Sequence, residues 1–99
     1  MNKKQILKFS EDYAQKAGFK LNPDKKQLNK IIKGLKKNED KYGFRFCPCR
    51  VVTGNFDEDR IIVCPCIYHK AEIKDMGHCL CRFFFDKDYE KKFKNNLKI

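Results

Sequence analysis

The first segment of the chain places apolar residues at the spacing of an amphipathic helix. The apolar side chains that recur mostly at helical intervals are Ile6, Leu7, Phe9, Tyr13, Ala14 and Ala17. Gly18 follows them at the position where a helix C-cap glycine belongs. This pattern predicts a helix from about Lys3 to Ala17.

A second helix is predicted after the segment "LNPDKK". Asn22 is a suitable N-cap, Pro23 suits the first helical position, and Asp24 lies where the helix dipole favours an acid. The apolar stripe that follows consists of Leu28, Ile31, Ile32 and Leu35, with Tyr42 two turns further on. Gly43 is a plausible stop, so this helix delivers the chain to Cys47.

The pattern is less regular after residue 50. The segment "RVVTGNFDEDRIIVC" fits two β-branched strands around a "TGN" turn, or a turn followed by a short helix from about Asp57. Periodicity does not separate these alternatives. In the tail, Tyr89, Phe93 and Leu97 lie four residues apart and predict one amphipathic helix that packs by a narrow face.

Composition limits the fold and the function. With 99 residues, of which 41% are hydrophobic and 36% charged, the chain fits one mainly α-helical domain that spans residues 1–99. No stretch reaches the roughly 18–20 apolar residues of a membrane span, and "MNKKQILKFSEDY" does not resemble a signal peptide. We therefore expect a soluble, cytoplasmic protein.

The formal net charge is +10, and lysines are spread along the whole sequence. This charge indicates either an ordinary solvated basic surface or a basic face for an acidic partner. Because no RNA-binding signature and no zinc-finger spacing of two cysteines and two histidines appears, we do not expect a nucleic-acid partner.

All six cysteines lie between residues 47 and 81, in three C-x-C pairs. The pairs are Cys47 with Cys49, Cys64 with Cys66, and Cys79 with Cys81. Disulfide frameworks of secreted domains spread their cysteines along the chain, whereas residues 1–46 contain none here. The clustering favours a metal or redox function. Proline in the middle of two pairs stiffens the backbone and suits two sulfurs with different roles.

The number of thiols leaves two kinds of metal site open. A cubane iron–sulfur cluster takes four cysteine thiolates, and the remaining two can form one disulfide. Zinc would use four cysteines and leave two spare thiols, or would recruit His69 and His78. Three kinds of protein therefore remain open: an iron–sulfur protein with one disulfide, an iron–sulfur electron carrier without disulfide activity, and a zinc-binding nucleic-acid module.

The order of the motifs resembles one known family. CPCR, then CPC, then a final C-x-C followed by hydrophobic residues, after a Pro-started helix with a Tyr-Gly turn, resembles the catalytic chain of ferredoxin:thioredoxin reductase. The resemblance covers roughly Ser10 to Phe85. It implies a mainly α-helical fold whose loops enclose a [4Fe-4S] cluster next to a redox disulfide. The iron ligands that it implies are Cys47, Cys64, Cys66 and Cys79.

The resemblance also implies a reaction. Single electrons from ferredoxin would pass through the cluster to a Cys49–Cys81 disulfide, which would reduce thioredoxin or a glutaredoxin-like disulfide protein by dithiol exchange. Cys49 would be the more exposed, nucleophilic thiol, and Arg50 is expected to help lower its pKa. We thus expect an oxidoreductase, with a small second subunit as a possible partner.

The chain departs from the family pattern at the last pair. Fourteen residues (50–63) separate the first two pairs and twelve (67–78) the last two, so the first gap is shorter and the second longer than in the plant and cyanobacterial enzymes. The family has a catalytic histidine between the last two cysteines, where this chain has Leu80. His78 is the expected substitute, with His69 further off. A shifted alignment that makes Cys79 the redox thiol would strand Cys81, and we reject it.

Overall fold

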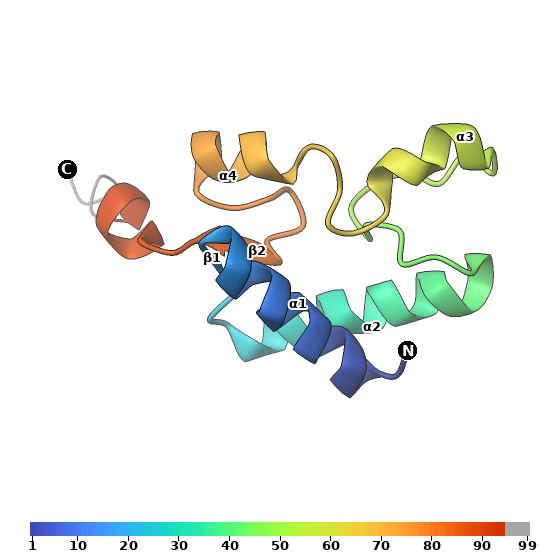
Figure 1. Cartoon of the computed structure of the whole chain (residues 1–99), viewed down its shortest axis with the longest axis horizontal. Coiled ribbons are helices and arrows are strands. Elements are labelled where there is room, and N and C mark those ends of the chain that lie inside the picture. Colours follow the sequence, from blue (N-terminus) through green and yellow to red (C-terminus); the bar gives the residue numbers. More distant parts are fainter. Residues whose placement is uncertain (95–99) are drawn as a thin grey trace.

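The computed structural model of the chain describes residues 1–94 (Figure 1). The elements are α1 (Lys3–Ala17), β1 (Phe19–Leu21), α2 (Lys25–Tyr42), α3 (Phe56–Asp59), η1 (Arg60–Ile62), α4 (His69–Met76), β2 (Phe84–Asp86) and η2 (Glu90–Lys94). The molecule measures 43 × 27 × 23 Å. Helix α2 runs along its long axis on one side, and α3 and α4 lie on the other (Figure 1). The predicted small, mainly helical fold is confirmed.

Helix α1 has the predicted bounds because both of its ends are capped. The Asn2 side chain accepts a hydrogen bond from the Gln5 backbone N–H, and the Gln5 side chain accepts one from the Asn2 N–H, each at 2.8 Å. This reciprocal pair is a capping box. At the other end Gly18 adopts the left-handed conformation, with φ of 82°, and ends the helix as predicted.

Helix α2 begins later than the sequence pattern predicts. Its N-cap is Asp24, whose carboxylate accepts hydrogen bonds from the backbone N–H groups of Lys26 and Gln27 at 2.9 and 3.4 Å. The prediction of Asn22 as the cap is therefore wrong. Asn22 is buried, and its side chain donates to the carbonyl oxygen of Arg82 at 2.9 Å. A long-range bond thus outweighs the local capping preference of this residue.

A two-stranded sheet joins the start of the chain to the segment after the last cysteine pair. Strands β1 and β2 run antiparallel, with Phe19 opposite Asp86 and Leu21 opposite Phe84. The sheet sits beside a core whose largest fully buried side chains are Ile6, Leu35, Ile73, Phe83 and Phe84. Three of the cysteines, Cys47, Cys79 and Cys81, belong to the same buried cluster. The cysteine site is therefore built into the core.

The middle segment contains a turn and a short helix, as one of the two sequence interpretations predicts. The Asn55 side chain caps α3 by accepting a hydrogen bond from the Asp57 N–H at 3.0 Å. The alternative of two strands is wrong, since Phe46 and Val63 form only an isolated bridge there.

The tail forms one turn of π-helix, η2. The rings of Tyr89 and Phe93 stack with their centroids 5.7 Å apart, while the third predicted residue, Leu97, lies outside the described residues. Among residues 1–94, no helix has the length and apolar character needed to cross a membrane.

Candidate redox-active cysteine site

The three C-x-C pairs lie in three irregular segments that meet between α2 and α4 (Figure 1). Backbone hydrogen bonds fix the first two segments to each other: the Cys47 N–H donates to the Ile62 carbonyl at 2.7 Å, and the Cys64 N–H donates to the Arg45 carbonyl at 2.8 Å. In the third segment the Cys79 N–H donates to the Phe84 carbonyl at 3.0 Å. The first two pairs are thereby held by residues distant in sequence, and the third by a residue five positions further on.

The six thiols differ in exposure. All six cysteines are free in this structure. Cys47, Cys66, Cys79 and Cys81 are buried, with exposed fractions of 4–7%, and Cys64 is half-buried. Cys49 is exposed. Cys49 is therefore the sulfur that a large partner can reach most easily.

The thiols of different pairs lie close enough to shift one another's pKa. The Cys47 thiol interacts with the thiols of Cys66 and Cys81, and the Cys49 thiol interacts with Cys81. Charge interactions extend this group to the remaining two cysteines, Cys64 and Cys79. The structure therefore gathers all six predicted cysteines in one place. The pair predicted to form a disulfide, Cys49 and Cys81, lies close enough for Cys81 to lower the pKa of Cys49.

Most of these thiols are held in the neutral form. A hydrogen bond from Cys66 lowers the pKa of Cys47, but the contact with Cys81 and burial outweigh it and raise the pKa to about 12. The hydrogen bond with Cys47 raises the pKa of Cys66, and burial raises that of Cys64 well above its usual range. A bound metal centre would supply the positive charge that deprotonates such thiols.

The surroundings of the sulfurs fit an iron–sulfur cluster, in which hydrogen bonds to the sulfurs set the potential. The Phe84 N–H donates to the Cys79 sulfur at 3.4 Å, and the backbone of Tyr68 donates to Cys66. The Arg50 guanidinium interacts with Cys66. Its buried Nε has no hydrogen-bond partner among the described residues. This unsatisfied donor suits a sulfur acceptor.

The cysteines are not arranged as the ligands of one ion. Within residues 1–94 no group of three or more Cys, His, Asp or Glu side chains is placed to hold a single metal ion. In a cubane cluster each of four thiolates binds a different iron atom. The fit to a cluster thus rests on the number, burial and hydrogen bonds of the thiols.

Arg50 contributes less to Cys49 than the sequence suggests. Although Cys49 is exposed, partial desolvation of its sulfur raises the pKa, and the lowering contributions of the Cys81 contact and of Arg50 do not offset it. The guanidinium of Arg50 is engaged elsewhere. It donates to the Glu72 carboxylate at 2.5 Å and lies 4.8 Å above the ring centroid of Tyr68. Arg50 acts in the predicted direction, but the net pKa of Cys49 lies above the usual value.

The two histidines have separate surroundings. The Nδ1 atom of His78 lies 2.8 Å from the Cys79 carbonyl oxygen, and the ring packs against Phe85 at 5.3 Å between centroids. His69 is buried, with one ring nitrogen bonded to the Tyr13 hydroxyl and the other to the Cys66 carbonyl. Among the described residues, no hydrogen bond joins either ring to a redox thiol. His69 therefore anchors the segment of the second pair.

Two residues of the site are missed by the sequence interpretation. Glu72, on α4, accepts hydrogen bonds both from Arg50 and from the backbone N–H of Leu80. Gly34, inside α2, allows the first pair to rest on that helix, because an added Cβ would lie 2.9 Å from the Cγ of Pro48. A glycine within a helical pattern is a weak signal of such close contact. The bonds of Glu72 leave no signal in the sequence.

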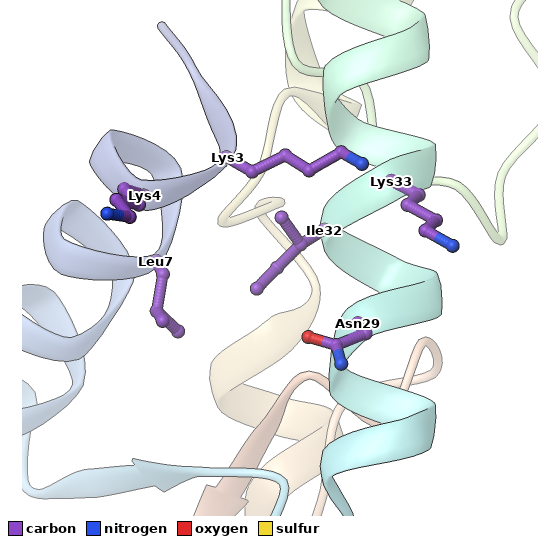
Figure 2. Close-up of a pocket in the computed structure, with 6 residues that line it drawn as sticks. All are labelled: Lys3, Lys4, Leu7, Asn29, Ile32 and Lys33. Carbon is purple, nitrogen blue, oxygen red and sulfur yellow. The ribbon is translucent and has the colours of Figure 1, made fainter.

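A separate cavity of about 360 Å³ lies between α1 and α2. Its lining consists of Lys3, Lys4, Leu7, Asn29, Ile32 and Lys33. Figure 2 shows Lys3 reaching from α1 toward α2, with Leu7 and Ile32 facing each other below it. The cavity contains no cysteine, so it belongs to the basic surface of the molecule and not to the redox site.

Comparisons with known proteins agree with the motif order. A family model described as "Ferredoxin thioredoxin reductase catalytic beta chain" matches residues 1–99. The chloroplastic ferredoxin-thioredoxin reductase catalytic chain of Arabidopsis thaliana is 33% identical over 89 residues, which cover 84% of this chain and 56% of that protein. This chain therefore spans little more than half of the Arabidopsis protein.

Two algal relatives are matched over more of their length. The ferredoxin-thioredoxin reductase catalytic chain of Porphyra purpurea is 30% identical over 95 residues, covering 90% of this chain and 74% of that one. That of Guillardia theta is 31% identical over 87 residues, covering 86% and 81%. The similarity therefore extends over most of both chains.

Proposed function

The chain belongs to the family of ferredoxin-thioredoxin reductase catalytic chains, and from this membership we propose that it is a ferredoxin-dependent, iron–sulfur disulfide reductase. The observation that carries the proposal is the contact between exposed Cys49 and buried Cys81 beside four further thiols. A structural metal site alone would have no use for an accessible thiol paired with a buried one.

The proposed cofactor is a [4Fe-4S] cluster. Its ligands would be the four cysteines Cys47, Cys64, Cys66 and Cys79. When bound, the cluster would accept and give electrons one at a time. The N–H donors directed at Cys79 and Cys66 would stabilise the thiolates against the surrounding apolar core.

The proposed redox pair performs two thiol exchanges. The thiolate of Cys49 attacks one sulfur of the partner's disulfide, which forms a mixed disulfide and releases one partner thiolate. Cys81 then attacks the Cys49 sulfur and releases the second partner thiolate. Two electrons pass to the partner, protons from solvent neutralise its thiolates, and the Cys49–Cys81 disulfide remains. Two electrons from ferredoxin, delivered singly, would restore the dithiol.

The acceptor would dock on an exposed apolar rim around Cys49. The side chains of this rim are Val51, Ile67, Tyr68 and Leu80, of which Val51 is 85% exposed. They come from all three cysteine segments. An apolar rim around one reachable thiol suits a folded disulfide protein such as thioredoxin or a glutaredoxin-like protein, because its disulfide must be brought against Cys49 over a contact surface.

The donor would dock on a stripe of lysines along α2. Lys30, Lys33, Lys37 and Lys41 follow helical spacing on its solvent side. The stripe runs beside Gly34 and Asn38. Gly34 meets Pro48 of the first pair, and the Asn38 side chain donates to the Phe46 carbonyl at 2.7 Å. An acidic ferredoxin bound there would lie next to the first cysteine pair.

A second small chain, which the term "catalytic chain" implies for the relatives, is part of the same proposal.

Charge reversal tests the donor face. Replacing Lys33 and Lys37 with glutamate should raise the KM for ferredoxin several-fold and weaken its dependence on salt, because surface charges steer association. The matched control is Lys16→Glu at the far end of α1. An equal effect of the control would contradict this docking site.

Metal analysis and one pair of variants test the function. The anaerobically purified chain should contain about four iron and four sulfide per chain. Cys49→Ser should keep this cluster and lose the reduction of thioredoxin-like disulfides. Zinc without sulfide would overturn the proposal. Normal reduction by Cys49→Ser would contradict the assigned role, and a full cluster without any disulfide reduction by the wild type would indicate an electron carrier.

His78 is the proposed substitute for the histidine that the family pattern places at residue 80. His78→Asn should slow partner reduction while leaving the iron content unchanged. An unchanged rate would assign His78 to the packing of the tail, in line with its contacts to Phe85 and Tyr89.

A further inference from the structure

One carboxylate connects the two segments that carry Cys49 and Cys81. Glu72 lies on α4, and its Oε2 accepts a hydrogen bond from the Arg50 Nη2 at 2.5 Å. Its other oxygen, Oε1, accepts one from the Leu80 backbone N–H at 3.2 Å. Arg50 directly follows Cys49 in the chain, and Leu80 directly precedes Cys81. The two bonds therefore act on the immediate neighbours of both redox cysteines.

The ion pair between Glu72 and Arg50 is largely shielded from solvent, and a neighbouring ring restricts its geometry. The Glu72 side chain is 17% exposed and that of Arg50 22%. The Arg50 guanidinium also lies over the Tyr68 ring, which restricts its orientation. Hydrogen bonds between charged groups in such partly dry surroundings are stronger than those of exposed pairs.

We propose that Glu72 is a positioning residue that keeps Cys49 and Cys81 at the separation at which their disulfide closes. A disulfide requires the two Cα atoms to lie within about 4.4–6.8 Å of each other. The two cysteines lie in different irregular segments, so their separation depends on contacts such as those of Glu72. The inference rests on the proposed function, because it assumes that these two cysteines form the redox pair.

The expected consequence is a change in redox potential. In a dithiothreitol buffer, the protein dithiol passes two electrons and two protons to oxidised dithiothreitol, and the Cys49–Cys81 bond forms as the dithiol form of the buffer appears. Loss of the Glu72 contacts lets the segments separate, so the disulfide becomes less favourable. One charge-assisted bond of this kind changes such an equilibrium by about tenfold, which equals a rise of about 30 mV for a two-electron couple.

Three variants of the cluster-loaded chain test this inference. Glu72→Ala removes both bonds, and Glu72→Gln keeps the shape and an acceptor for Leu80 but loses the charge that binds Arg50. Asp75→Asn is the matched control, since Asp75 is an exposed acid on the same helix. We expect the potential to rise most in Glu72→Ala, less in Glu72→Gln and not in Asp75→Asn, with iron content unchanged. Arg50→Gln should behave like Glu72→Gln and should add little to it.

The outcomes separate this inference from the proposed function. If the wild type shows no Cys49–Cys81 disulfide in any buffer, the proposed function fails and this inference fails with it. If the wild-type disulfide titrates and Glu72→Ala shifts its potential no more than Asp75→Asn does, only the positioning role is overturned. If Glu72→Ala does not fold, the potentials of Glu72→Gln and Arg50→Gln are compared with that of Asp75→Asn instead. Equal potentials would overturn the positioning role.

Discussion

The N-terminal half of the chain and the cysteine segment are stabilised in different ways. Residues 1–43 contain no cysteine and form two long capped helices whose hydrogen bonds lie mostly within each helix. Residues 44–83 contain all six cysteines, only short helices, and contacts between residues far apart in sequence. The comparison indicates that local backbone hydrogen bonds hold the helices of the first region, whereas the second depends on long-range contacts, on its sulfur contacts and on whatever they bind.

The largest effect should follow from removing a proposed cluster ligand. Cys64→Ser should lose nearly all iron and sulfide, because a cubane cluster needs four thiolates. Without the cluster, the buried thiols of the cysteine segment lose their common partner, while α1 and α2 should persist. Anaerobic iron analysis together with helical circular dichroism measures both consequences. Full iron content in Cys64→Ser would contradict the ligand assignment.

Two C-cap glycines provide a matched test of the regions. Gly77 ends α4 with φ of 84°, and Gly18 ends α1 with φ of 82°. A Cβ on Gly77 would also lie 2.6 Å from the rings of Tyr89 and Phe93, whereas Gly18 has open space. Gly77→Ala should therefore lower the free energy of unfolding by about 2–4 kcal/mol.

Gly18→Ala should lower the free energy of unfolding by only about 1–2 kcal/mol, the strain of holding an alanine in the left-handed conformation. Urea unfolding of the two variants measures the difference. Equal costs would show that the tail does not pack against Gly77.

The contact between the regions can be weakened at Asn22. Its backbone N–H donates to the Phe83 carbonyl at 3.0 Å, and its side chain donates to the Arg82 carbonyl. Asn22→Ala leaves the Arg82 carbonyl, whose hydrogen bond is partly buried, without this donor and should cost about 1–3 kcal/mol. Asp24→Ala removes only the helix cap and should cost about 1 kcal/mol. Thermal unfolding compares the loss of stability in the two variants. A larger loss for Asp24→Ala would mean that Asn22 does not join the regions.

The smallest effect concerns pH and Asp59. Hydrogen bonds from the backbone N–H and hydroxyl of Thr53 and from the Gly54 N–H lower the pKa of this carboxyl. A lowered folded-state pKa stabilises the fold above the ordinary value of about 4, and this contribution is lost as the pH falls through the lower, folded value. The difference in Tm between the wild type and Asp59→Asn should shrink below about pH 4. A constant difference from pH 6 to pH 3 would contradict the account.

Much of the scaffold could be predicted from the sequence because it depends on local patterns. The bounds of α1, the end of α2 at Gly43 and the short helix after Asn55 follow from residues within one or two turns. The pattern predicts the wrong cap for α2 because Asn22 bonds to Arg82 and Phe83, about sixty positions away. The pattern does not predict the sheet, because three-residue strands show too little alternation. It does not predict α4, because only two of that helix's side chains, His69 and Ile73, are buried.

The sequence predicts which cysteines form the candidate site, but it does not predict how the segments that carry them are held together. The clustering of six cysteines indicates one metal and redox centre, and the structure gathers their thiols. The spacing could not reveal which side chains hold the segments together. Glu72 is separated from Arg50 by 22 residues and from Leu80 by eight, and no local pattern relates them. The pKa of Cys49 is likewise raised by partial desolvation of its sulfur, although the residue is exposed, and the C-P-C-R motif does not indicate this effect.

The central claim, that four cysteines serve the cluster while Cys49 and Cys81 form the redox pair, is tested most directly by mapping the disulfide. The oxidised, cluster-loaded chain is denatured anaerobically in excess alkylating agent, and its peptides are analysed by mass spectrometry. We expect one disulfide-linked peptide pair that contains Cys49 and Cys81, and alkylation of the four other cysteines. A disulfide between any other pair, or alkylation of all six, would contradict the claim.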